Sequence, residues 1–482
     1  MRSFISKNSY FFILAAILLF VLAVSLPTLT TRPRLWADEA KSIELALNFE
    51  RFGMLDMQTA PGELSGIPHL LQSTGYPVTA PLAGIFSLFG FSMTVARTYM
   101  LFWMIAALCG IFFFLRRLFG VREAIFAIAL IATFASFHDN ARTVVGEIPG
   151  FLFMIIGLWV LLFHFQYDEN HLFFESALAG FFFGLAVVTK PSIYMAILPA
   201  ITVTLYFRDQ DIKRWFWEVC VLAIGAIIPA ILWFFLVFGN PLGPLNISAW
   251  QEVALFWQNP FDDGSLWSNI LYNAQGIIFS STLLYFGMLF VVLLLAAKHF
   301  WHTEEKRIFF VFVVVYSALA FFYYLRSPGW LRYIIAAELL ILMSVPYALG
   351  AVMKWRHGAS LVCSVLITIQ IIHFFTVAQI YTSDVALRAG QALNDRYPTK
   401  TIAILGEPTI ALFIPPERKH QIIEMVGLPV LGKNPLFSDP LPDVALSAGN
   451  GKFLAEAEDI ISSFYFPAES IQGYPIFIRR AQ

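Results

Sequence analysis

The sequence predicts an all-α polytopic membrane protein with a small α/β domain outside the membrane at its C-terminal end. Three observations support this fold class. The 482 residues are 59% hydrophobic and only 13% charged, whereas soluble proteins carry roughly 25% charged residues. About eleven apolar runs approach the roughly 20 residues that a membrane-spanning helix needs. Beyond about residue 380, the long apolar runs give way to short helical and strand-like patterns.

The predicted spans follow one another closely along the first part of the chain. The first has Arg2 and Lys7 ahead of it and no small-residue cleavage site at its end, which is typical of an uncleaved membrane anchor. The chain divides into a transmembrane domain at 1–380 and an extracytoplasmic domain at 381–482. We expect spans near 10–29, 92–115, 122–137, 148–167, 171–188, 191–207, 215–238, 276–297, 307–325, 331–353 and 358–380.

Basic residues in four short loops predict the orientation of the chain, because short cytoplasmic loops are enriched in Lys and Arg. With these loops in the cytoplasm, the N-terminus is cytoplasmic, and the loops at 30–91 and 138–147 and the C-terminal domain lie outside. We expect this orientation in the inner (plasma) membrane of a bacterium. The basic residues are Arg116, Arg117, Arg122, Arg208, Lys213, Arg214, Lys298, Lys306, Arg307, Lys354 and Arg356.

The first outer loop has structure of its own. Residues 38–52 (DEAKSIELALNFERF) repeat apolar side chains at helical spacing. We expect this amphipathic helix to lie on the outer surface of the membrane. A Gly- and Pro-rich stretch at 61–81 leads into an apolar segment at 80–90, which is too short to span. We therefore expect that segment to be interfacial or re-entrant.

The last hundred residues predict a small α/β domain. Residues 383–397 have the pattern of a helix that ends before Pro398. A buried strand is expected over 401–405, with further strands near 443–447 and 474–478. This domain shows no arrangement of residues typical of a nucleophile or a metal site.

The outer face collects at least three carboxylates and four cations, and the predicted spans are nearly free of charge. A transporter would place such residues near the middle of the bilayer, so their position disfavours that class. No basic stripe occurs in the sequence, which disfavours nucleic acid as a partner. The three cysteines lie in apolar runs, without the spacing of a disulfide framework or a metal site. The outer charged residues of interest are Asp38, Glu39, Arg142, Glu147, Lys190, Arg326 and Arg332.

A face with several cations and carboxylates suits a sugar donor that is linked to a polyprenyl phosphate. The lipid of such a donor lies in the bilayer, and its phosphate lies at the interface. Arg and Lys bind phosphate, and Arg does so with two parallel hydrogen bonds. A carboxylate that accepts the proton of an attacking hydroxyl contributes roughly 10²- to 10⁴-fold to the rate. Attack in one step inverts the anomeric centre.

Short motifs occur in a fixed order along residues 1–350. They are Trp36-Ala37-Asp38-Glu39-Ala40, Tyr76-Pro77 through Pro81-Leu82 with Phe89-Gly90 and Arg97, Arg142 to Glu147, Thr189-Lys190, and Arg332-Tyr333. In this order they resemble the GT-C superfamily of polyprenyl-phosphate-sugar-dependent glycosyltransferases, and within it the protein O-mannosyltransferase and aminoarabinose-transferase group. Aminoarabinose transferases have a Lys before the proline that corresponds to Pro81. This chain lacks it, which leaves the sugar open.

The resemblance implies roles for the outer residues. Asp38 becomes the catalytic base on the acceptor hydroxyl, and Glu147 supports it by positioning the donor or the acceptor. Metal dependence stays undecided, because relatives in the superfamily differ and Asp38 and Glu39 together are able to hold a divalent metal ion. The substrate-binding candidates are Glu39, Arg142, Lys190, Arg332 and Arg326.

Simpler interpretations exist for several of these residues. Asp38 has the position of a helix N-cap, Glu39 that of a first-turn acid favoured by the helix dipole, and Lys190 that of a lysine reaching from a span end to the interface. For the whole chain, the alternatives are a polymerase or ligase of lipid-linked polysaccharide and, less favoured, a transporter or flippase. The acceptor stays open among a glycolipid, a polysaccharide and a protein.

Overall fold

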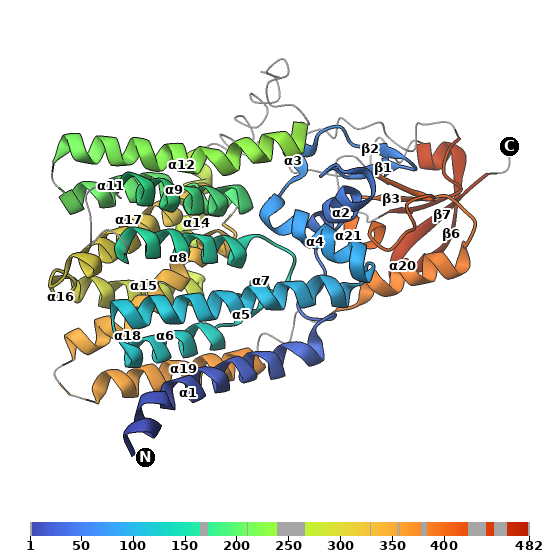
Figure 1. Cartoon of the computed structure of the whole chain (residues 1–482). Coiled ribbons are helices and arrows are strands. Elements are labelled where there is room, and N and C mark those ends of the chain that lie inside the picture. The colour runs from blue at the N-terminus through green and yellow to red at the C-terminus, as the bar shows by residue number, and fades with distance from the viewer. Residues whose placement is uncertain are drawn as a thin grey trace.

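The computed structural model shows a bundle of helices with a small sheet at one end (Figure 1). The N-terminus and the short helix α16 (Ala297–Phe300) lie at the opposite end of the bundle. This architecture confirms the predicted fold class. The structure describes residues 2–163, 172–209, 211–238, 266–327, 329–353, 355, 357–376, 383–422, 440–447 and 460–480.

The long helices of the bundle run side by side (Figure 1). Glycines allow some of them to approach closely, as is common in membranes. A Cβ at Gly180 would lie 2.0 Å from the carbonyl oxygen of Leu222, and a Cβ at Gly225 would lie 2.0 Å from that of Ala177. The helices are α1 (Arg2–Ser25), α5 (Met93–Leu118), α6 (Val121–Thr133), α7 (Ala135–Arg142), α8 (Glu147–Phe163), α9 (Leu172–Thr189), α10 (Pro191–Tyr194), α11 (Ile197–Asp209), α12 (Ile212–Phe238), α14 (Leu266–Phe279), α15 (Ser281–Leu295), α17 (Glu304–Arg326), α18 (Ile335–Val352) and α19 (Gly358–Thr376).

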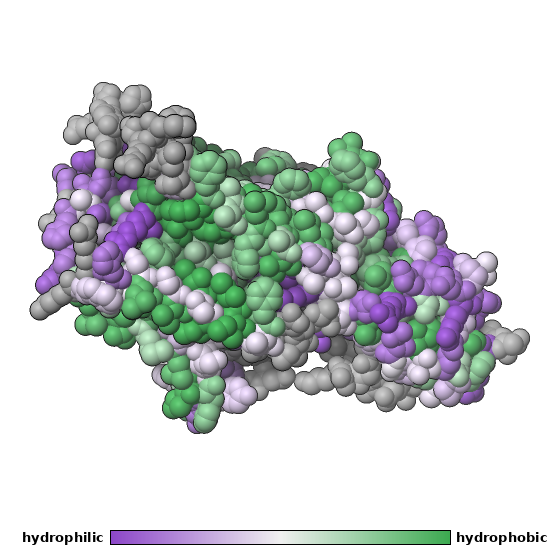
Figure 2. Space-filling model, turned by 90° about the horizontal axis from the view of Figure 1, so that it is seen from below, coloured by the Kyte–Doolittle hydropathy of each residue, from purple (hydrophilic) through white to green (hydrophobic). Residues whose placement is uncertain are grey.

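The surface of the bundle matches a membrane environment. Figure 2 shows hydrophobic residues over the middle of the molecule and hydrophilic residues toward both ends. In the described part of the chain, six helices are long and apolar enough to cross a membrane, or up to eight when each bent pair counts as one span. The chain is thus a multi-pass membrane protein. The number of about eleven spans stays a prediction.

Two of the predicted spans are not straight. The segment predicted at 122–137 bends by 70° between α6 and α7, where Phe134 leaves the helical conformation. The segment predicted at 276–297 begins inside α14 and bends by 84° before α15. There the Ser280 hydroxyl accepts a hydrogen bond from the Leu283 N–H and caps the second helix. Apolar composition alone does not reveal such breaks.

Parts of other predictions fall outside the described residues. They are Lys354 and Arg356 of the fourth basic loop, the last residues of the spans predicted at 148–167 and 358–380, the first residue of the span predicted at 171–188, and residues 381–382, 423–439, 448–459 and 481–482 of the predicted C-terminal domain.

The first outer loop forms α2 (Ala37–Phe52), a two-stranded ribbon of β1 (Gln58–Ala60) and β2 (Glu63–Leu64), α3 (Pro68–Leu71) and α4 (Tyr76–Phe89). The helix predicted over 38–52 is therefore present. It is not a surface helix with an exposed polar face, because Glu44 and Asn48 on that face are buried. The C-terminal domain and α4 cover it, and the sequence pattern could not show that cover.

The C-terminal domain contains a five-stranded mixed sheet in the order β4-β3-β5-β7-β6. The predictions of a helix over 383–397 and of strands near 401–405, 443–447 and 474–478 are confirmed. The strands β4 and β6 were not predicted, since neither shows a clear apolar alternation. The elements are α20 (Val385–Arg396), β3 (Ile402–Leu405), α21 (Pro408–Ala411), β4 (Lys419–Ile422), β5 (Val444–Ser447), β6 (Tyr465–Ile471) and β7 (Tyr474–Arg479).

A buried polar contact joins this domain to α2. The Lys419 ammonium lies 2.6 Å from the Glu44 carboxylate, and the Gln421 amide donates to the same carboxylate oxygen at 2.6 Å. The backbone N–H of Gln58 also donates to it, at 3.1 Å. The C-terminal domain therefore holds the helix that begins with Ala37 and Asp38.

Candidate active site

Four charged residues predicted from distant parts of the sequence meet at the sheet end of the bundle. The Nη1 of Arg332 donates to Oδ2 of Asp38 at 2.7 Å. The Lys190 ammonium lies 3.5 Å from Oε1 of Glu147. Lys190 also acts electrostatically on Asp38, and Glu147 on Arg332, so the two pairs form one cluster. We call Asp38, Glu147, Lys190 and Arg332 the carboxylate–cation cluster.

Two glycines let the elements of this cluster approach one another. The Gly75 N–H donates to the carbonyl oxygen of Thr189 at 3.0 Å, and a Cβ there would lie 1.8 Å from the carbonyl oxygen of Val188. A Cβ at Gly146 would lie 2.4 Å from the Thr189 carbonyl oxygen. Any larger residue at either position would displace the end of α9, and with it Lys190, from Glu147 at the start of α8.

Asp38 lies in the first turn of α2, and its carboxylate is partly exposed. The N-cap position is Trp36, so the alternative that Asp38 caps the helix is wrong. Burial raises the pKa of Asp38, but the charges of Lys190, Arg332 and Lys41 outweigh burial and hold the pKa below its ordinary value. Asp38 is therefore a carboxylate at neutral pH, in the state that accepts a proton.

The Arg332 guanidinium is positioned by aromatic rings as well as by Asp38. It lies 4.5 Å from the ring centroids of Trp36 and Trp330 and 5.5 Å from that of Tyr333. Its Nε has no hydrogen-bond partner among the described residues. Arg332 lies in the 3₁₀ helix η3 (Leu331–Ile334), directly before α18. The Nε is buried, but the side chain as a whole is 16% exposed, and a planar cation at such a partly open position is suited to bind a phosphate.

Glu147 is the deepest member of the cluster. It is fully buried at the start of α8, and both carboxylate oxygens lack a hydrogen bond to the described residues. Its charge is balanced by Lys190, which is only 3% exposed. The simpler interpretation, in which Lys190 reaches from its span end toward the interface, is therefore wrong. The Tyr194 hydroxyl donates to the backbone carbonyl of Glu147 and fixes this turn.

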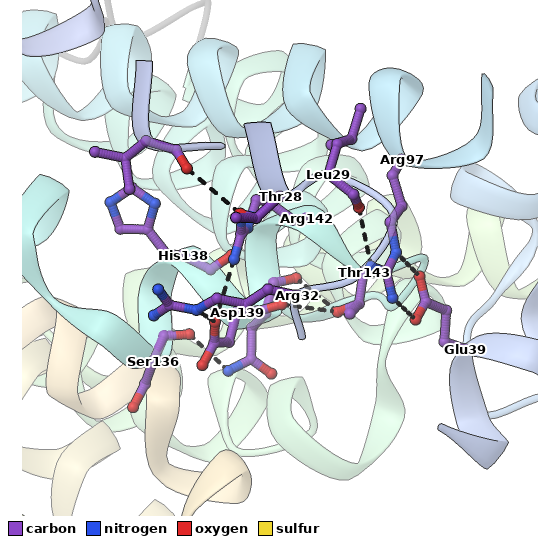
Figure 3. Close-up of polar contacts among 12 residues, drawn as sticks. Thr28, Leu29, Arg32, Glu39, Arg97, Ser136, His138, Asp139, Arg142 and Thr143 are labelled. Carbon is purple, nitrogen blue, oxygen red and sulfur yellow. Dashed lines mark hydrogen bonds and ion pairs between the residues drawn. The ribbon is translucent and has the colours of Figure 1, made fainter. Parts of the chain in front are cut away.

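Glu39 follows Asp38 directly but belongs to a different contact. The Nε and Nη2 of Arg97 donate to its two oxygens at 2.8 and 2.7 Å, and both side chains are fully buried (Figure 3). The backbone N–H of Val144 donates to Glu39 as well, at 3.3 Å. Arg97 donates further to the carbonyl of Leu29 at 2.9 Å. This pair ties α2 to α5, and Glu39 is enclosed by protein.

Arg142 also lies apart from the carboxylate–cation cluster. Its guanidinium is fully buried, donates to the Thr28 hydroxyl at 3.0 Å and lies 3.5 Å from Asp139 (Figure 3). Asp139 is shared with Arg32, at 3.7 Å. This second network joins the segment that follows α1, which contains Thr28 and Arg32, to α7. Arg326, at the end of α17, makes no ion pair with a carboxylate of the described residues.

Sequence reasoning missed the partners in these contacts. Arg97 appeared only within a motif, although a lone cation at the start of an apolar span implies a buried carboxylate partner. That signal does not say which carboxylate is the partner. Asp139 and Arg32 carried no signal of their own, because each is one charged residue among several in a predicted outer loop.

The metal expectation stays a prediction. The carboxylates of Asp38 and Glu39 bind different arginines, so their oxygens do not converge. Within the part of the chain that the structure describes, no group of three or more His, Cys, Asp or Glu side chains has the arrangement of a metal site.

Comparisons with known proteins point to one superfamily. The family model described as dolichyl-phosphate-mannose-protein mannosyltransferase matches residues 77–233, which include Glu147 and Lys190. No curated protein sequence matches the chain. Among solved structures, the chain is similar to ArnT from Cupriavidus metallidurans bound to undecaprenyl phosphate, with a TM-score of 0.65 and 15% identity over 98% of both chains.

A second similarity extends to a different enzyme. The Archaeoglobus fulgidus oligosaccharyltransferase in its apo form has a TM-score of 0.56 and 12% identity, covering 87% of this chain and 65% of the other. At such identities the likeness establishes the fold. ArnT and this oligosaccharyltransferase are both GT-C glycosyltransferases. This chain therefore has the GT-C fold, and the resemblance to the GT-C superfamily drawn from its sequence motifs is confirmed.

Proposed function

We propose that this chain is an integral membrane glycosyltransferase that moves a sugar from a polyprenyl-phosphate donor to an acceptor hydroxyl. The observation that carries the proposal is the carboxylate–cation cluster, in which Asp38 pairs with Arg332 at 2.7 Å beside Lys190. It combines a base with two phosphate-binding cations at one end of a membrane bundle. The fold shared with a structure that holds undecaprenyl phosphate supports a lipid-phosphate donor.

The donor phosphate would bind Arg332 and Lys190. Arg332 offers a partly exposed guanidinium that the rings of Trp36 and Trp330 already hold in place. A phosphate there would compete with Asp38 for the guanidinium. Binding of the donor would then release the carboxylate from its ion pair and raise its proton affinity, at the step when a base is needed.

The reaction balances with these residues. The acceptor oxygen forms a bond to the anomeric carbon, and the bond from that carbon to the phosphate oxygen breaks. The proton of the acceptor hydroxyl passes to Asp38, and the electron pair of the broken bond stays on the lipid phosphate. Arg332 and Lys190 neutralise that negative charge, which makes the phosphate a better leaving group. Attack from the face opposite the phosphate inverts the anomeric centre.

Glu147 has a positioning role in this scheme. Its buried carboxylate lies 3.5 Å from the Lys190 ammonium and holds the lysine near Asp38. We assign a structural role to Glu39 and Arg142 as well. Their partners are Arg97 and Asp139, and we do not expect either residue to contact the substrate.

We place the active site on the non-cytoplasmic side of a bacterial inner membrane. The basic residues Arg116 and Arg117 lie in the last turn of α5, and Lys298 lies in α16. Figure 1 places α16 at the bundle end opposite the sheet. Since cytoplasmic loops are enriched in such residues, that end would face the cytoplasm, and the cluster would face outward.

The test uses a deletion strain that carries either the wild type or Asp38→Asn at equal expression. Mass spectrometry of envelope glycans, glycolipids and proteins should show one sugar that is lost in the deletion and returns with the wild type alone. That sugar and its carrier identify the donor and the acceptor. Full restoration by Asp38→Asn would reject Asp38 as the base. No change in any sugar would reject the glycosyltransferase and favour a transporter.

A further inference from the structure

A cavity of about 410 Å³ lies between the first outer loop and the C-terminal domain. Its size falls within the range of small-ligand sites, which is about 300–1,000 Å³. One wall is the loop before α2, a second is the start of α20, and a third is the segment around α21 together with the first residue of β7. The residues that matter below are Arg34, Trp36, Asp384, Glu407, Phe413 and Tyr474.

The cavity adjoins the carboxylate–cation cluster. Trp36 and Ala37 line it, and Asp38 is the next residue of the chain. The Arg332 guanidinium also lies over the ring of Trp36, 4.5 Å from the centroid of that ring. One tryptophan thus belongs both to the cavity wall and to the site where the donor phosphate would bind. None of the four cluster side chains is among the described residues that line the cavity, so an acceptor bound there would extend past Trp36 to reach Asp38.

Backbone hydrogen bonds and side-chain packing hold the walls of the cavity in place. The Ser383 N–H donates to the carbonyl oxygen of Thr31 at 3.0 Å, which closes the chain leading into α20 against the first loop. Gly390 allows Phe413 to pack on α20, since a Cβ at Gly390 would lie 2.5 Å from Cβ of Phe413. The Phe413 ring in turn contacts the Phe91 ring, with centroids 6.4 Å apart.

The lining combines aromatic rings, hydroxyl groups and charges of both signs. Trp36, Phe413 and Tyr474 supply rings, and Tyr474 lies within electrostatic reach of Glu407 and Arg34. Glu407 accepts a hydrogen bond from the Thr409 hydroxyl. Sugars bind to such surfaces, because their C–H faces pack on rings and their hydroxyls both donate and accept hydrogen bonds.

The charges of the lining residues restrict the chemical class of the ligand further. Two carboxylates, Asp384 and Glu407, line the cavity against one guanidinium, Arg34. Asp384 is balanced from outside the cavity by Arg388, at 2.8 Å. The cavity therefore carries no excess of positive charge, unlike a phosphate site. A phosphorylated ligand would meet carboxylates without matching cations.

We propose that this cavity binds a phosphate-free sugar residue of the acceptor and presents its hydroxyl to Asp38. The inference rests on the proposed function, and it selects a glycan acceptor over a protein. An extended peptide would normally pair with a sheet edge. Neither edge strand of the sheet, β4 or β6, supplies a residue to the described lining of the cavity, so a peptide bound there would not extend the sheet.

The experiment fills the cavity and leaves the cluster intact. Val385 lines the cavity and is exposed on α20, so Val385→Trp would occupy it. Gln391→Trp is the matched control, since it places the same side chain at another exposed position of α20. Tyr474→Phe is a milder variant that removes one hydroxyl and keeps the ring.

The full chain in detergent is probed with an array of bacterial envelope glycans, both phosphate-free and phosphorylated, and with Ser/Thr-containing peptides. The expected result is that at least one phosphate-free glycan binds the wild type and Gln391→Trp equally. It should bind at least about 10-fold more weakly to Val385→Trp and measurably more weakly to Tyr474→Phe. The 10-fold loss corresponds to about 1.4 kcal/mol.

A parallel titration with undecaprenyl phosphate separates the two proposals. If the wild type and Val385→Trp bind this lipid equally, the donor site is intact whatever the glycan result. Failure of the wild type to bind the lipid would count against the proposed function. Lipid binding without any glycan binding, equal glycan binding by Val385→Trp, or preference for phosphorylated glycans or peptides would each overturn the assignment of the cavity.

Discussion

Asp38 and Glu39 are consecutive residues of α2, and each binds an arginine from a distant part of the chain. Their surroundings differ. The Asp38–Arg332 pair has side-chain exposures of 20% and 16%, whereas Glu39 and Arg97 are both fully buried. Arg332 keeps an Nε without a partner, while Arg97 uses three of its nitrogens in hydrogen bonds. The Asp38–Arg332 pair is therefore able to exchange partners, whereas the Glu39–Arg97 pair is closed to other groups.

This difference shows that the two acids of one short motif have different roles. The second acid anchors the helix to α5 through Arg97, so that the first acid is held where a substrate can reach it. A pair of adjacent carboxylates is therefore no sign of a chelate or of two catalytic groups. Substitutions that separate activity from stability test this division directly.

The largest expected effect is the loss of activity in Asp38→Asn. The amide keeps the size of the side chain but cannot take the proton of the acceptor, so the transfer rate should fall by roughly 10²- to 10⁴-fold. The thermal unfolding midpoint should stay near that of the wild type, because the side chain is partly exposed. Purified protein in detergent provides both measurements. A large drop in the midpoint would make Asp38 a structural residue like Glu39.

The opposite outcome is expected for Arg97→Met. Removing the guanidinium leaves the Glu39 carboxylate buried and uncompensated, which typically costs about 3–5 kcal/mol of stability. The double variant Glu39→Gln/Arg97→Met should recover part of this loss, because no charge is then left unpaired. Denaturation of matched preparations measures it. If Arg97→Met unfolds like the wild type yet has lost activity, the closed pair belongs to the site.

A smaller effect on substrate binding is expected for Arg332→Met. A hydrogen bond to a charged group is worth about 1.5–3 kcal/mol, so affinity for undecaprenyl phosphate should fall by roughly 10- to 100-fold. Lys213→Met serves as the control, since it removes an exposed cation beyond the start of α12. Binding is measured by titration of the lipid into full-length protein. Equal losses in both variants would indicate nonspecific attraction to the lipid.

The smallest expected effect is a change in pH dependence. Burial raises the pKa of Asp38, but Lys190, Arg332 and Lys41 together bring it below its ordinary value. The ionised base is present above that pKa, so kcat/KM, which reports the enzyme before the donor binds, should hold at mildly acid pH and fall only as the pH drops through the lowered pKa. In Arg332→Met the pKa rises, and the acid limb should move to higher pH. An unmoved limb would show that another group controls it.

The sequence predicted much of this molecule, for reasons that differ between regions. Long apolar runs predicted the bundle because burial in lipid depends on local composition. The order of the motifs predicted that Asp38, Glu147, Lys190 and Arg332 are important. The sequence could not predict which cation faces which acid, since Arg142 and Lys190 look alike in a predicted loop. That choice depends on close packing at Gly75 and Gly146, which is a property of the assembled bundle.

The buried contact between Glu44 and Lys419 has a consequence for the order in which the protein is made. These residues are 375 positions apart in the chain, so α2 leaves the ribosome long before the domain that covers it. Until β4 has formed, the Glu44 carboxylate lacks its cation, and the start of α2 has no partner on that side. The helices of the bundle precede β4 in the chain, so they are synthesised before it. The cover of α2 is therefore completed last, after all four residues of the carboxylate–cation cluster have been synthesised.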